Sequence, residues 1–170
     1  MEYNKLPGTD IDVSKICLGT MTWGRQNSES EAFEQMDYSL DKGVNFFDTA
    51  ELYPVPATPD RYADTERIIG NWLESRKTRD KIILASKIAG PGDYTAHIRK
   101  TGFRGNSIED AINGSLERLK TDYIDLYQLH WPERTTNYFG KRGFDYVDDG
   151  WTDNFREILE TLNKIVNSGK

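Results

Sequence analysis

The sequence predicts an α/β fold in which parallel strands alternate with helices. Short apolar runs that suit buried strands alternate four times with longer segments whose apolar residues recur at helical spacing. The helix-to-strand links are short, whereas the strand-to-helix links are long and rich in Gly, Pro, Tyr and Trp. The chain has 170 residues, enough for one real core and too few for two ordinary domains. We therefore expect residues 1–170 to form a single domain.

The predicted elements follow one another in a regular order. The first twenty residues read as a short β-hairpin that turns at Leu6-Pro7-Gly8. Strands are expected at residues 15–18, 44–47, 81–86 and 123–129. Helices are expected at about residues 28–42 and 60–75, and beginning near residues 107 and 153.

Capping residues support the helix boundaries. Ser28 and Glu31 have the spacing of a capping box, and Ser107 and Asp110 resemble one. Asp153 is a candidate N-cap for the last helix. Two glycines indicate where helices end, Gly43 and Gly169.

The alternation of strand and helix implies a parallel sheet, because each crossover helix returns the chain to the same edge. The four long loops, at residues 19–27, 48–59, 87–106 and 130–152, must then leave the carboxyl ends of the strands. Barrels and open α/β sheets both place their chemistry there. An open flavodoxin-like sheet competes with a barrel, although the first loop lacks the G-x-G-x-x-G spacing of a phosphate loop.

Composition narrows the class of partner. The net charge is −6, with acidic and basic residues interleaved, which argues against nucleic acid and anionic membranes. The sequence has neither an apolar run of roughly 18 residues nor a signal-peptide pattern, so a cytoplasmic protein is expected. Cys17 lies in an apolar run and is expected to be a buried, reduced thiol.

Three polar residues stand at the ends of predicted strands, and a fourth lies in a loop beside them. Asp48, Lys87 and His130 should meet at the mouth of one sheet, with Tyr53 overhanging it. A neighbouring ammonium stabilises a phenolate, so Lys87 could make Tyr53 a better proton donor, with Asp48 as the counter-charge. These groups suit the protonation of a developing alkoxide, which is half of a carbonyl reduction.

Each residue also has a structural interpretation. Asp48 could only end a strand, Lys87 could form a surface ion pair, His130 could be a satisfied core histidine, and Tyr53 could only pack its loop. Their convergence favours a site, but periodicity alone leaves the reaction undecided.

Four motifs occur in order along the chain: Leu18–Gly24, Asn45–Tyr53, Ser86-Lys87 and Ser115–Pro132. They resemble the aldo-keto reductase superfamily, and within it the branch of bacterial Tas-like proteins and potassium-channel beta subunits. The resemblance implies the N-terminal half of a TIM (β/α)8 barrel, with four βα units preceded by a short β-hairpin. It also implies NADPH-dependent reduction of aldehydes or ketones, with no metal.

The resemblance assigns roles by position. It makes Tyr53 the general acid, has Lys87 and Asp48 lower its pKa, and has His130 orient the substrate carbonyl. The first-loop residues Thr20, Met21 and Gln26, together with Asp48, match positions that approach the cofactor. For the loop at residues 130–152 two interpretations stay open, that its aromatic residues wall the substrate pocket or that they only anchor the loop: Trp131, Tyr138, Phe139, Phe144, Tyr146 and Trp151.

The chain holds four strand-helix units, whereas a complete barrel has eight and needs about 250 residues. We therefore expect a partial reductase, inactive by itself, with two bare strand edges and an apolar inner face that favour homo-oligomers. The alternative is a non-catalytic half-barrel that serves assembly or regulation. A metal-dependent hydrolase ranks far behind, since the only histidines are His97 and His130.

Overall fold

A four-stranded parallel sheet organises the chain. The computed structural model describes residues 1–134, 136–137, 142–146, 148 and 153–170. The strands run in the order β3-β4-β5-β6, which confirms the predicted succession of parallel crossovers. Their bounds are Cys17–Gly19 for β3, Phe46–Asp48 for β4, Ile83–Ile88 for β5 and Leu126–Leu129 for β6.

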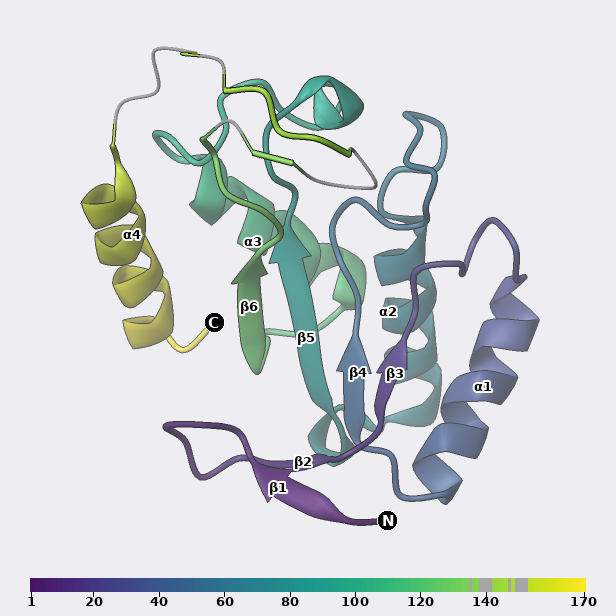
Figure 1. The fold of residues 1–170 in the computed structure, drawn as a ribbon. Coiled ribbons are helices and arrows are strands. Elements are labelled where there is room, and N and C mark those ends of the chain that lie inside the picture. The colour runs from purple at the N-terminus through teal and green to yellow at the C-terminus, as the bar shows by residue number, and fades with distance from the viewer. Residues whose placement is uncertain (135, 138–141, 147, 149–152) are drawn as a thin grey trace.

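The helices cover one face and one edge of this sheet (Figure 1). Helices α1, α2 and α3 lie along one face, and α4 lies beside β6. Their bounds are Glu29–Asp41, Asp64–Arg76, Ser107–Leu119 and Phe155–Asn167 for α1 to α4, with short 3-10 turns η1 at Arg79–Lys81 and η2 at Asp93–Thr95. No helix in the described ranges is long and apolar enough to cross a bilayer.

The predicted hairpin lies across the amino ends of the strands (Figure 1). Strand β1 (Tyr3–Lys5) pairs antiparallel with β2 (Asp12–Ser14). Asn45, just before β4, fixes it there: its Oδ1 accepts from the Ser14 N–H at 2.7 Å, and its Nδ2 donates to the Asp12 carbonyl at 2.9 Å. The hairpin therefore closes the end of the sheet opposite the long loops.

The helix starts follow the capping predictions in part. Ser28 and Glu31 form the predicted capping box. The box at Ser107 is wrong: Ser107 is the first residue of α3, and its hydroxyl lies 2.7 Å from that of Thr101. Asn154, not Asp153, is the N-cap residue of α4, although Asp153 Oδ1 accepts from the Phe155 N–H at 3.0 Å.

Helices α2 and α3 approach closely at Gly70. A Cβ added there would lie 2.1 Å from the backbone oxygen of Arg118. The contact therefore requires glycine at this position.

Alternation along the strands separates two faces of the sheet. Leu18, Phe47 and Leu84 pack into the core beneath the helices, and Phe47 and Leu84 are fully buried. Their neighbours face the opposite, inner side, which is apolar at Phe46, Ile83 and Leu126 and polar toward the strand ends. The predicted apolar inner face is thus only partly apolar.

Cys17 begins β3 on this inner face. It is exposed, so the predicted burial is wrong. Leu18, the next residue, takes the core-facing position.

Candidate active site

An ion pair between neighbouring strands forms the floor of the site. Lys87 Nζ, in β5, donates to Asp48 Oδ2 at 2.6 Å and to the Thr49 carbonyl at 2.7 Å. Gln128 Nε2, in β6, donates to Asp48 Oδ1 at 3.3 Å. The sequence-based interpretation missed Gln128, although the parallel register sets it directly opposite Lys87.

Tyr53 and His130 stand next to this pair. Lys87 Nζ lies 4.9 Å from the centroid of the Tyr53 ring. The His130 ring meets the Tyr53 ring edge-on, with centroids 5.7 Å apart. His130 is the first residue after β6, and its backbone N–H donates to the Ile88 carbonyl at 3.1 Å. The four predicted residues therefore converge at one end of the sheet.

The acidity of Tyr53 differs from the prediction. Burial, and secondly the charge of Asp48, raise the pKa of Tyr53 to about 12; the expectation that Lys87 and Asp48 together lower this pKa is wrong. The Lys87 ammonium is bound by the Asp48 carboxylate and lies over the face of the Tyr53 ring. The negative charge of Asp48 therefore offsets most of the effect of the Lys87 charge on the phenol. Tyr53 carries its proton at neutral pH.

His130 is neutral at the same pH. Burial and the Lys87 charge lower its pKa to about 4, against opposing effects of Asp48 and Glu51. A neutral imidazole has one N–H to donate. It can therefore donate a hydrogen bond to a carbonyl oxygen without adding a positive charge.

The predicted cofactor residues separate into two places. Thr20 is buried, and its hydroxyl donates to the Asp48 carbonyl at 2.9 Å. Met21 is exposed, and its carbonyl accepts from the Val55 N–H at 3.0 Å. Both therefore adjoin the site. Gln26 instead lines a cavity of about 480 Å³ beside the start of α2.

The surface at the end of β3 is open beside Asp48. A Cβ built on Gly19, which pairs with Asp48 in the sheet, would meet no atom within 4 Å. Among the described residues, no three His, Cys, Asp or Glu side chains gather as a metal site would require.

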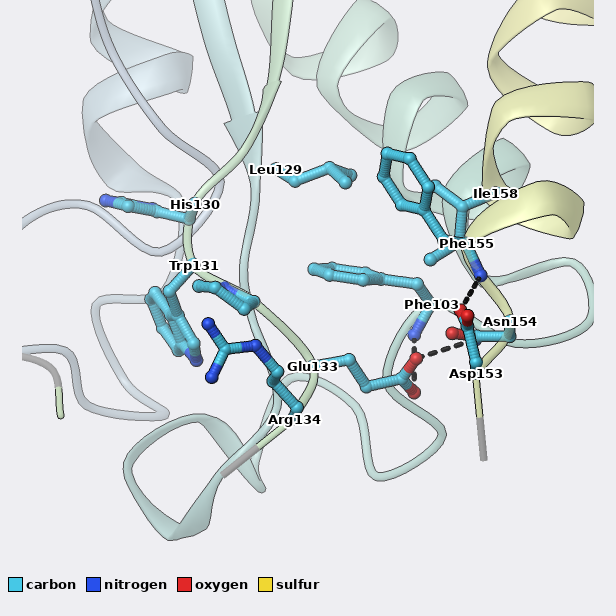
Figure 2. Close-up of a pocket in the computed structure, with 11 residues that line it drawn as sticks. Phe103, Leu129, His130, Trp131, Glu133, Arg134, Asp153, Asn154, Phe155 and Ile158 are labelled. Carbon is cyan, nitrogen blue, oxygen red and sulfur yellow. Dashed lines mark hydrogen bonds between the residues drawn. The ribbon is translucent and has the colours of Figure 1, made fainter. Parts of the chain in front are cut away.

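A separate cavity of about 630 Å³ lies between β6, α4 and the loop before α3. Figure 2 shows Leu129, Phe103 and Phe155 pointing into it, whereas the His130 side chain points away. His130 also lines this cavity, whereas Asp48, Tyr53 and Lys87 do not.

The described aromatic residues of the loop after β6 differ in burial. Trp131 is 6% exposed and its Nε1 donates to the Pro91 carbonyl at 2.9 Å, which favours the anchoring interpretation for this residue. Phe144 and Tyr146 are exposed. The remaining three, Tyr138, Phe139 and Trp151, lie outside the described residues.

Comparison with known proteins identifies the family. The model of the Aldo/keto reductase family matches residues 15–170. Protein tas of Escherichia coli is 42% identical over 172 residues, covering 100% of this chain and 50% of that protein. Norsolorinic acid reductase B of Aspergillus parasiticus is 34% identical over 182 residues, covering 99% of this chain and 41% of that protein.

A solved structure agrees with these relatives. The aldo-keto reductase AKR11C1 from Bacillus halodurans, in its holo form, superposes with a TM-score of 0.69 at 31% identity, covering 99% of this chain and 47% of that one. The chain thus spans about half the length of the proteins it matches, and its parallel sheet is a partial α/β barrel. The chain belongs to the aldo/keto reductase family.

Proposed function

We propose that the chain carries the acid–base residues of an NADPH-dependent oxidoreductase that reduces aldehydes or ketones to alcohols. One observation supports this most: Asp48, Lys87, Tyr53 and His130 converge at the carboxyl end of the sheet with a protonated phenol beside a neutral imidazole. We also propose that residues 1–170 form a single domain. We propose a cytoplasmic location for the protein.

The proposed chemistry divides the work between the cofactor and the chain. NADPH, when bound, supplies a hydride to the carbonyl carbon. The His130 N–H would orient the carbonyl oxygen, and the Tyr53 hydroxyl would give that oxygen a proton. An alkoxide is a much stronger base than a phenolate, so this transfer is downhill even with a pKa of about 12.

Lys87 has two tasks in this proposal. Its ammonium, 4.9 Å from the Tyr53 ring centroid, would hold the face of that ring by a cation–π contact. Its bond to Asp48 gives the ammonium a carboxylate partner, although the Lys87 side chain is only 11% exposed. Thr20, Met21 and Asp48 would contact the cofactor. For Gln26 we propose a cofactor contact only within the cavity beside α2, which it lines.

Because the chain spans about half of its relatives, we propose that the activity belongs to a completed barrel and that the 170-residue chain alone is inactive. The test joins this chain to the half of Protein tas that it does not match and follows NADPH oxidation with a panel of aldehydes and ketones. We expect turnover with NADPH in the completed protein and none in the isolated chain. A folded chimera that binds NADPH and reduces no carbonyl would overturn the proposal.

A second candidate is self-assembly, favoured by the surface of α4. Phe155, Leu159 and Val166 are 57%, 45% and 71% exposed, and their spacing sets them along one stripe of the helix. In the described ranges, β3 and β6 each hydrogen-bond to a single neighbouring strand, so each has one unpaired edge. Sedimentation analysis would show a mass above the 19.6 kDa monomer if a second copy covers this side, and a monomer at every concentration if it does not.

A further inference from the structure

A buried carboxylate lies between two of the proposed catalytic residues. Glu51 follows Asp48 and precedes Tyr53 in the loop after β4, and it is 1% exposed. A carboxylate so deeply buried needs a partner charge and hydrogen bonds to remain ionised.

Four donors satisfy its two oxygens. Arg99 binds it with both terminal nitrogens, Nη1 to Oε2 at 2.7 Å and Nη2 to Oε1 at 2.5 Å. The Tyr62 hydroxyl donates to Oε1 at 3.0 Å, and the Ala89 N–H donates to Oε2 at 2.9 Å. Glu51 therefore joins its own loop to three other segments: the residues just before α2, the residue after β5 and the loop that follows η2.

Backbone bonds at Thr49 and at Glu51 hold the loop against β5. The Thr49 N–H donates to the Ala85 carbonyl at 2.9 Å, and the Glu51 N–H donates to the Lys87 carbonyl at 3.0 Å. With the Ala89 N–H bound to the Glu51 side chain, these contacts continue the pairing of β4 and β5 past the end of β4. Tyr53 leaves this segment two residues after Glu51, so its ring position depends on where the segment is held.

We propose that Glu51 and Arg99 are positioning residues that hold the Tyr53 loop on the end of β5 and so set the Tyr53 ring over Lys87 and beside His130. We call this pair the Glu51–Arg99 clamp. The inference rests on the proposed function, in which Tyr53 is the proton donor.

A second buried pair provides a matched control. Glu66, fully buried, binds Arg118 Nε at 2.7 Å and accepts from the Ser86 hydroxyl at 2.6 Å. It has the same chemistry and depth as the clamp. Its contacts join α2 to α3 and β5, with no bond to the loop at residues 49–53.

The titration of His130 reports where the loop lies. Burial and Lys87 lower the His130 pKa to about 4, whereas Asp48 and Glu51 raise it. If Glu51→Gln only removed a charge, the His130 pKa would fall further. If it releases the loop, the Tyr53 ring leaves His130, water enters, and the pKa rises from about 4 toward the ordinary 6.5. The two effects have opposite signs.

The experiment is a pH titration of the histidine ring protons by NMR on the 170-residue chain. The sequence has only two histidines, so a His97→Gln variant assigns the His130 signal. We expect Glu51→Gln to raise the His130 pKa and Glu66→Gln to leave it at the wild-type value. An unchanged or lower pKa in folded Glu51→Gln overturns the clamp, as does an equal rise in Glu66→Gln.

If Glu51→Gln does not fold, Arg99→Lys decides. Lysine keeps the positive charge but cannot reproduce the two-nitrogen contact, so the His130 pKa should rise, and an unchanged value overturns the proposal. The titration needs neither cofactor nor turnover. Its failure is therefore distinguishable from failure of the proposed reductase function.

Discussion

Replacing His130 with glutamine should make the folded protein less sensitive to acid. The pKa of His130 in the folded chain is about 4, whereas in the unfolded chain it returns to an ordinary value of about 6.5. As pH falls below 6.5, the His130 imidazole binds a proton in the unfolded chain but not in the folded chain. The folded state therefore loses stability down to about pH 4, and glutamine removes this loss.

The linkage relation gives the size of the effect. Between about pH 7 and about pH 4.5, a fully buried histidine with these two pKa values would lower the free energy of unfolding by about 2 kcal/mol. Because the His130 side chain is partly exposed, solvent screening reduces this to about 1 kcal/mol.

Urea unfolding followed by tryptophan fluorescence measures it, since the chain has four tryptophans. The wild type should lose about 1 kcal/mol more than His130→Gln between the two pH values. His97→Gln, at the exposed second histidine, is the matched substitution. Equal pH dependence in the wild type and His130→Gln would refute the reasoning that His130 is held neutral by burial and Lys87.

Two further predictions concern packing and assembly. Gly70→Ala should destabilise the fold by about 2 kcal/mol or more, because its Cβ would meet the Arg118 backbone oxygen at 2.1 Å. Gly114→Ala, whose Cβ would meet the Arg118 side chain at 2.8 Å and no backbone atom, should cost less than Gly70→Ala, and equal urea midpoints for the two variants would contradict this. If the chain self-associates through α4, Leu159→Lys should restore the 19.6 kDa monomer in sedimentation, whereas an unchanged assembly would place the contact elsewhere.

The order of the elements and the convergence of the site could be predicted from local sequence patterns. Alternating strand and helix signals fix a parallel sheet, and parallel strands bring Asp48, Lys87 and His130 to one end whatever the details of packing. The capping box at Ser28 was equally local. The box expected at Ser107 failed because the preceding loop places the Thr101 hydroxyl against it, a contact between residues six apart that capping spacing does not include.

The energetics of the site could not be predicted in the same way. The direction of the shift in the Tyr53 pKa depends on how deeply the ring is buried and on which groups bind Lys87. The spacing of residues along the sequence reveals neither. Glu51 reads in the sequence as an ordinary loop charge, since its partner Arg99 is 48 residues away. Cys17 was expected inside because its neighbours are apolar, but a one-residue difference decides which face of a strand a side chain takes.

The most direct test of the proposed chemistry is the rate of aldehyde reduction by the completed barrel with Tyr53→Phe. The change removes one hydroxyl from a side chain that is 9% exposed and leaves its ring contacts with Lys87 and His130 in place. We expect turnover to fall by at least about 100-fold, with NADPH binding unchanged and with the exposed Tyr38→Phe behaving as wild type. Turnover at the wild-type rate in Tyr53→Phe would contradict the assignment of Tyr53 as the proton donor.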